Sequence, residues 1–321
     1  MPLETLEFEE PIAVLLKEIE ALTALPRTGA RDREIETLGR RLVAVRAGLY
    51  KSLTPWQRVL VARHPNRPGL EDFIQRLFTG FVEIHGDRRF ADDHALMTGF
   101  AEYRGQPVLL VGHVKGGDTK EKIFRNFGYA RPEGYRKALR AMRLAEKFRR
   151  PIVIFVDTPA AYPGIESEER GVAEAIAVNI RDMMLLDTPI IVIVSGEGGS
   201  GGALGIAIGD RVLMQEFAIY SVIPPEGCAA LVWRDASKKA EAAAALKLTA
   251  PDLLEFGIID AIVGEPIGGA HTDPGAAAQL VDDVLAQALG EVSAMTSETR
   301  LAKRYEKFRN MGRAGIEFLE E

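Results

Sequence analysis

Two uninterrupted apolar runs constrain the fold of this 321-residue chain more than any other feature. They are PIVIFV at residues 151–156 and PIIVIV at residues 189–194. A strand with one face in water alternates apolar and polar residues, whereas a strand covered by helices on both faces is apolar throughout. Amphipathic stretches at 132–149 and 166–186 predict long helices around the first run. Together these segments predict an α/β domain with a parallel sheet between helical layers.

Shorter segments extend this prediction along the chain. Residues 70–80 have the pattern of a helix, and the part of the chain from Pro225 onward is predicted to be mainly helical. Further strands are expected at 107–114, 211–214, 218–222 and 261–263.

The N-terminal region has a different pattern of apolar residues. Apolar residues recur at spacings of three and four in 11–25 and again in 35–49, and Pro26 and Gly29 lie between these stretches. The pattern predicts an antiparallel helical hairpin whose apolar stripe packs on the main body or on a partner. The expected domains are a hairpin arm at 1–53, a main domain at 54–295 and a charged C-terminal tail at 296–321.

Charge and cysteine content narrow the function classes. The chain has 40 Lys and Arg against 46 Asp and Glu, a net charge of −6, which argues against a nucleic-acid-binding protein. Cys228 is the only cysteine, so neither an intrachain disulfide nor a multi-cysteine zinc site is expected. The sequence shows no secretion signal and no apolar run of the roughly 18 residues that a membrane span needs. A cytoplasmic protein is therefore expected.

The densest chemical signal is the segment SGEGGSGG at 195–202, directly after the second apolar run. Its five glycines lack Cβ atoms, so a ligand can approach the main chain there. Gly201 and Gly202 open a predicted short helix, and the first N–H groups of a helix have no partner within it. Such N–H groups stabilise an anion, so Gly201 and Gly202 are the candidate catalytic residues.

Other enzyme classes use similar glycine patterns. The segment matches G-x-S-x-G, the nucleophile motif of serine hydrolases, with Ser200 as nucleophile and Asp260 and His271 as possible partners. The run from Gly196 to Gly201 also matches the dinucleotide pattern G-x-G-x-x-G, but no acidic residue closes a following strand at the right distance. A phosphate loop of the kinase type is excluded because its lysine is missing.

Two further loops follow predicted strands. They are DTPAAYPG at 157–164 and the basic stretch KGGDTKEK at 115–122. Ligands of open α/β sheets bind at the carboxyl ends of the strands, so the loops are expected to line one cleft. The candidate substrate-binding residues are Ala161, Tyr162, Gly164, Gly198, Gly199, Lys115 and Gly116.

Taken together, these segments resemble one family closely. HVKGGDTKEKIFRNFG, RPEGYRKALRAM, FVDTPAAYPGIESEERG, SGEGGSGGALGIAIGD, YSVIPPEGCAALVW and EPIGGAH occur in order and with normal spacing. They resemble the carboxyltransferase alpha subunit of bacterial multi-subunit acetyl-CoA carboxylase. The chain departs from the family motifs at Ala160, where the family has glycine, and at Gly117, where it has arginine.

The resemblance implies a crotonase-like (ClpP-like) spiral of β-β-α units. It implies transfer of a carboxyl group from N-carboxybiotin to acetyl-CoA, which gives malonyl-CoA for fatty acid synthesis. The implied partners are a beta subunit, as an α2β2 assembly, a biotin carboxyl carrier protein and biotin carboxylase. Biotin would be presented by the carrier, and zinc would belong only to the beta subunit. Neither a metal nor a covalently bound cofactor is expected on this chain.

The resemblance also assigns chemistry to the glycines. Gly201 and Gly202 would stabilise the ureido oxygen of biotin. Leu204 stands where crotonase-type hydratases carry a catalytic glutamate, which argues against hydratase chemistry. Two alternatives remain, a non-catalytic scaffold with the same fold and a serine hydrolase that uses Ser200.

Overall fold

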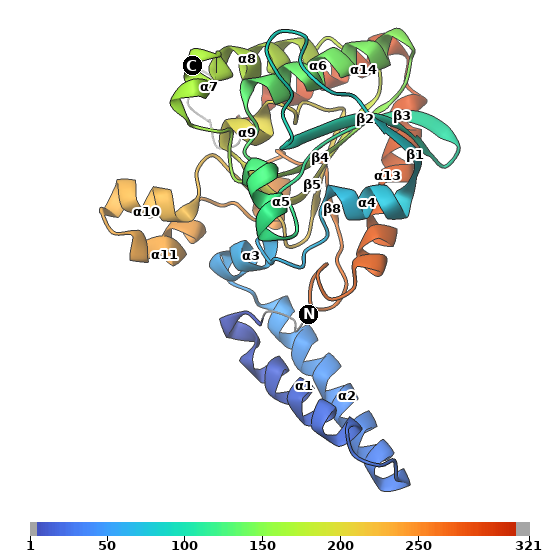
Figure 1. The fold of residues 1–321 in the computed structure, drawn as a ribbon, viewed down its shortest axis with the longest axis vertical. Coiled ribbons are helices and arrows are strands. Elements are labelled where there is room, and N and C mark those ends of the chain that lie inside the picture. The colour runs from blue at the N-terminus through green and yellow to red at the C-terminus, as the bar shows by residue number, and fades with distance from the viewer. Residues whose placement is uncertain (1–4, 313–321) are drawn as a thin grey trace, which may run out of the picture.

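The computed structural model describes residues 5–312 and arranges them around one eight-stranded sheet (Figure 1). The strand order is β1-β2-β3-β4-β5-β6-β8, and β7 pairs with β5. The pairs β1–β2 and β2–β3 are antiparallel, and the remaining pairs are parallel. The strands are β1 (Phe78–Glu83), β2 (Leu96–Tyr103), β3 (Gln106–His113), β4 (Ile152–Thr158), β5 (Ile190–Gly199), β6 (Arg211–Gln215), β7 (Ile219–Ser221) and β8 (Ala261–Val263).

The two apolar runs form the centre of this sheet. They become β4 and β5, which pair in parallel with Ile152 opposite Ile190. Side chains of β4 alternate between two separate clusters, with Ile154 in one and Phe155 in the other. The prediction of a parallel sheet covered on both faces is confirmed.

Helices supply the other half of each cluster. On one face the sheet packs against α6 (Pro132–Lys147) and α8 (Val172–Met183). On the opposite face it packs against α4 (Leu70–Leu77) and α13 (Pro274–Ser293). Figure 1 shows α6 and α8 above the sheet and α4 and α13 beside it.

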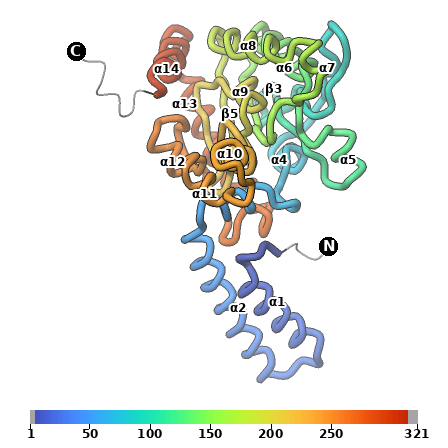
Figure 2. The backbone as a smooth tube through the Cα atoms, turned by 90° about the vertical axis from the view of Figure 1, so that its left-hand side faces the viewer, coloured from blue at the N-terminus to red at the C-terminus, as the bar shows by residue number. Residues whose placement is uncertain are grey.

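The N-terminal hairpin projects from the body, as both ribbon and tube show (Figures 1 and 2). It consists of α1 (Glu10–Thr23) and α2 (Gly29–Lys51), as the spacing of apolar residues predicts. Its base is joined to the body by a small apolar cluster that includes Tyr50 and Phe217. The Tyr50 hydroxyl donates a hydrogen bond of 2.7 Å to Glu9.

The remaining elements are short or C-terminal. They are η1 (Glu7–Glu9), α3 (Pro55–Ala62), α5 (Thr119–Phe124), η2 (Asn126–Gly128), α7 (Ile165–Glu169), α9 (Ser200–Leu204), α10 (Pro225–Trp233), η3 (Ala236–Lys238), α11 (Lys239–Ala245), α12 (Ala250–Glu255) and α14 (Ser297–Asn310). No helix among residues 5–312 is long and apolar enough to cross a membrane.

The segment expected to be a charged tail contains α14, and the part from residue 313 onward lies outside the described residues. Arg304 of α14 is buried and fixes this helix to the body. Its guanidinium donates to Asp210 at 2.8 Å and to the carbonyl oxygens of Met183, Leu186 and Thr188.

Two local predictions were wrong. The single helix expected over 166–186 is two helices, because Gly171 adopts a left-handed φ of 77° between α7 and α8. The helix predicted over 70–80 ends at Leu77, and the chain continues directly into β1. Strands β1 and β2 were not predicted.

Candidate active site

The glycine segment forms the turn from β5 into α9. Ser200 takes a left-handed φ of 47° at this turn. A Cβ at Gly199 would lie 1.8 Å from the carbonyl oxygen of Pro159, and one at Gly202 would lie 2.4 Å from the carbonyl carbon of Ala160. The glycine loop is therefore pressed against the backbone of the second predicted loop, and only glycine fits at these contacts.

Gly201 has different surroundings from Gly202. A Cβ at Gly201 would meet only the Cδ1 atom of Ile176, at 3.4 Å, and the residue is half-buried. Both glycines lie in the first turn of α9, where N–H groups have no acceptor within the helix. Packing is therefore close at Gly202 and open at Gly201, and the catalytic role of both residues stays a prediction.

The second loop is held by its neighbours. The Tyr162 N–H donates to the carbonyl of Ala130 at 2.9 Å, and the Arg131 guanidinium lies 4.8 Å from the centre of the Tyr162 ring. A Cβ at Gly164 would lie 2.4 Å from the same ring. Ala160 does not have positive φ, so this position accepts alanine without backbone strain.

The third loop joins the other two through Lys115. Its ammonium lies 2.6 Å from Asp157 at the end of β4 and 2.8 Å from Glu197 within the glycine segment. Gly116 next to it has φ of 87°, and a Cβ there would lie 2.6 Å from the backbone nitrogen of Lys122. The three predicted loops therefore meet at the carboxyl ends of β3, β4 and β5.

A cluster of ion pairs lies where the three loops contact one another. Arg63 contacts Glu197 and Glu226 at 2.6 Å each, and the Glu197 N–H donates to Asp157 at 2.9 Å. Burial alone would raise the pKa of the Glu197 carboxyl, but Lys115 and Arg63 outweigh it and hold the pKa below its ordinary value. The cluster is thus charged, and it fixes the middle of the glycine segment to β4 and α3.

Lys115 is the only member of this cluster that the sequence analysis selected. Asp157 and Glu197 could have been found, because one ends a buried strand and the other interrupts the glycines. Arg63 gives no such signal, since it lies 134 residues before Glu197 and pairs with it only through the fold.

The parts of a serine hydrolase triad are not brought together. Asp260 accepts from the Val212 N–H and pairs with Lys307. His271 stacks on His64 with 3.9 Å between ring centres. Among residues 5–312 no hydrogen bond joins Ser200 to either of them, so the geometry does not support the hydrolase interpretation.

Comparison with known proteins decides the family. The model of the acetyl co-enzyme A carboxylase carboxyltransferase-like family matches residues 5–312. The chain belongs to this family. Proteins named acetyl-coenzyme A carboxylase carboxyl transferase subunit alpha are similar over most of their length. The one from Geobacter metallireducens is 54% identical over 96% of this chain and 97% of the relative. The one from Oceanobacillus iheyensis is 50% identical over 96% of this chain and 98% of the relative.

Solved structures show the fold of this family member. Transcarboxylase 12S with methylmalonyl-coenzyme A and methylmalonic acid bound aligns with a TM-score of 0.58 at 19% identity, over 72% of this chain and 43% of that one. A Pseudomonas malonate decarboxylase hetero-tetramer in complex with coenzyme A aligns with a TM-score of 0.55 at 19% identity. The alignment covers 67% of this chain and 86% of that one. The predicted crotonase-like fold is confirmed.

Proposed function

We propose that this chain is the alpha half of a carboxyltransferase that moves a carboxyl group from carboxybiotin to acetyl-CoA. The product is malonyl-CoA for fatty acid synthesis. Family membership along 5–312 supports this activity. The single structural observation that carries it is the glycine turn, which offers first-turn N–H groups beside free space at Gly201.

The chemistry follows from those donors. Carboxybiotin, delivered on the carrier protein, supplies the carboxyl group as CO2 and then takes the proton that the acetyl methyl group loses. The N–H groups of Gly201 and Gly202 donate to the ureido oxygen while it carries negative charge. A pre-oriented donor of this kind is worth about 3 kcal/mol in the transition state. The new bond forms between the methyl carbon of acetyl-CoA and CO2.

The three loops position these donors. Lys115 and Arg63 neutralise Glu197, so the glycine segment cannot move away from β4 without breaking partly buried ion pairs. Tyr162 and Ala161 line the approach from the second loop, and we assign them to contact with substrate. Gly164, Gly198, Gly199 and Gly116 act by letting the backbones approach each other.

A beta subunit is the proposed partner. Large apolar side chains are exposed near the carboxyl ends of the strands, among them Phe124, Phe127 and Ile165. We propose that the beta subunit covers them in an α2β2 assembly, carries the zinc and provides most of the acetyl-CoA site. Biotin carboxylase and the carrier protein complete the enzyme. The cytoplasmic location expected from the sequence stays a prediction.

Reconstitution tests this proposal. Malonyl-CoA formation is measured with the chain alone, with the beta subunit alone and with both, and carrier-linked carboxybiotin is the donor. We expect activity only with both, because neither half contains the whole cleft. Robust transfer by the chain alone would contradict the proposal that the site is divided between this chain and the beta subunit. Activity of the beta subunit alone would favour the alternative of a non-catalytic scaffold.

A further inference from the structure

A cavity rich in arginine lies on a different part of the surface from the candidate active site. It has a volume of about 580 Å³ and lies between the loop after β1 and helices α6 and α8. Its apolar lining includes Leu139 and Val178, and Asp87 and Glu174 are the carboxylates among the described residues that line it. Six lining residues are arginines, namely Arg88, Arg89, Arg136, Arg140, Arg143 and Arg181.

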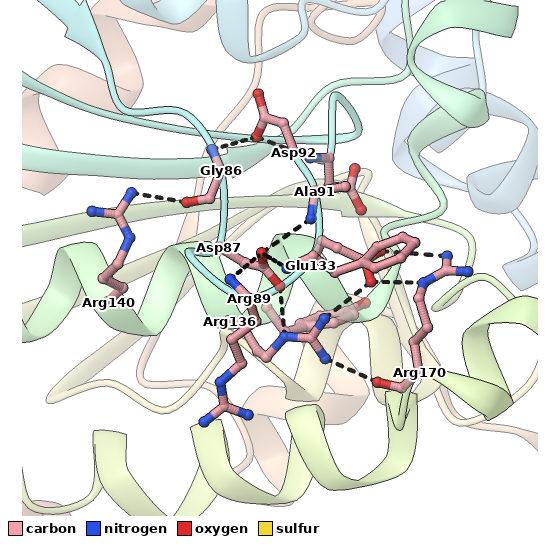
Figure 3. Close-up of polar contacts among 12 residues, drawn as sticks. Gly86, Asp87, Arg89, Ala91, Asp92, Glu133, Arg136, Arg140 and Arg170 are labelled. Carbon is pink, nitrogen blue, oxygen red and sulfur yellow. Dashed lines mark hydrogen bonds and ion pairs between the residues drawn. The ribbon is translucent and has the colours of Figure 1, made fainter.

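Asp87 is ion-paired with Arg136, and its oxygens are taken up by that contact and by the loop backbone (Figure 3). Its Oδ1 atom accepts from the N–H groups of Arg89 at 2.9 Å, Phe90 at 2.8 Å and Ala91 at 3.2 Å. Its Oδ2 atom accepts from Arg136 at 2.8 Å. The carboxylate therefore serves to order the loop and to hold Arg136.

The loop carries two arginines that have no partner. The side chains of Arg88 and Arg89 are exposed and make no hydrogen bond or ion pair within the described part of the chain. Arg88 has a left-handed φ of 63°, which the loop enforces at a non-glycine residue. An ordered loop thus presents two adjacent free guanidinium groups to the cavity.

The other four lining arginines are partly matched by acids, and Arg136 is paired with both Asp87 at 2.8 Å and Glu133 at 3.0 Å. Arg140 donates only to neutral carbonyls, Gly86 at 2.9 Å and His85 at 3.1 Å. Burial is the main cause that lowers the pKa of the Arg140 guanidinium, and the charge of Arg88 lowers it further against the opposing effect of Asp87 and Asp92. Arg143 and Arg181 share one carboxylate, Asp182.

We propose that this cavity binds a small polyanion that carries two or more linked phosphate groups. Guanidinium groups bind phosphate oxygens in a bidentate manner, and several arginines converge here around a concave site. The volume suits a nucleotide-sized ligand, since small-molecule sites have about 300–1,000 Å³. The apolar wall at Leu139 and Val178 offers contact for a base. The site goes beyond the proposed carboxyl transfer.

Binding is tested by calorimetric titration of the full chain purified with its partner subunit. The probes are inorganic tripolyphosphate, ADP and monophosphate at matched ionic strength. We expect saturable binding of tripolyphosphate or ADP at least about tenfold tighter than that of monophosphate, because linked phosphates engage several arginines at once. If ADP binds more tightly than tripolyphosphate, the base contacts the apolar wall.

Substitutions locate the site. Arg88→Gln with Arg89→Gln removes the two unpaired guanidinium groups and no contact that holds the fold. We expect affinity to fall at least about tenfold. The matched control is Arg33→Gln with Arg41→Gln, two exposed arginines of α2, which should bind as the parent does. The proposal is overturned if no probe saturates, or if both double variants lose affinity equally.

Discussion

At the scale of single residues, Gly201 is the position that best separates catalysis from packing. We predict that Gly201→Val lowers carboxyl transfer by roughly 100-fold or more, the scale of losing an oxyanion donor. Its new side chain enters free space, where Ile176 is the one near neighbour in the described part of the chain, and it would crowd the ureido ring and turn the N–H groups away. The measurement is steady-state transfer with the beta subunit, paired with sizing of the complex.

Ser200→Ala is the matched control for this variant. It changes the adjacent residue of the same turn and leaves the backbone donors in place, so most activity should survive. Gly202 is unsuitable for the test, because its Cβ would collide with the backbone of Ala160 and disturb the fold. A fully active Gly201→Val complex would reduce the loop to a packing turn, and an inactive Ser200→Ala complex would revive the hydrolase alternative.

His113 makes a second prediction at this scale. Burial, reinforced by Lys115, lowers the pKa of its imidazole from 6.5 to about 3, and neither ring nitrogen has a hydrogen-bond partner within residues 5–312. Below pH 6.5 the unfolded chain therefore binds a proton at His113. The folded chain does not bind this proton until the pH falls to about 3. Stability should fall through this window as the pH falls, by up to about 1.4 kcal/mol per pH unit for this group.

Denaturant unfolding at several pH values checks the contribution of His113. In His113→Leu the decline of stability between pH 6.5 and 4 should be shallower than in the parent, since leucine fills the buried site without taking up a proton. An identical pH dependence in both proteins would show that His113 is not the group responsible.

At the scale of elements, the sequence predicted what is encoded locally. Strands β4 and β5 were found because burial on both faces leaves an unbroken apolar run. Strand β1 was missed because Gly80, with φ of 62°, interrupts it and its register with β2 shifts. The glycine loop was found because its five glycines stand close together in the sequence at 195–202. The ion pair of Arg63 with Glu197 was missed because its partners are distant in sequence.

Helix α14 shows how one side chain holds an element. Arg304 is 1% exposed, and its guanidinium satisfies Asp210 and three carbonyl oxygens. Arg304→Gln leaves Asp210 buried without its charge partner, which typically costs about 3–5 kcal/mol. We predict a matching loss in the free energy of unfolding by denaturant. Lys303→Gln, on the exposed side of the same helix, should change it little, and equal losses would show that helix propensity alone matters.

At the scale of the whole molecule, the shape of the chain implies a missing neighbour. Helix α10 projects to one side (Figure 1), whereas the neighbouring α11 packs on α3 through Ala243. The side chains of Leu231 and Val232 in α10 are 74% and 65% exposed. This helix begins at Pro225, which lines a narrow pocket with Gly198 and Gly199 of the candidate active site. Exposed apolar side chains on a helix that begins at the site fit a partner that completes the cleft.

We therefore predict that Leu231→Ser with Val232→Ser weakens binding of the beta subunit at least about tenfold, because buried apolar side chains dominate such interfaces. Far-ultraviolet circular dichroism and the melting temperature of the chain alone should stay as in the parent, since both side chains are mostly exposed. At saturating beta subunit the transfer rate should return, because no catalytic group has changed. The control is Val14→Ser with Val43→Ser on the hairpin, equally apolar and 58% and 55% exposed. Unchanged affinity in the α10 variant, or an equal loss in the hairpin variant, would place the partner elsewhere.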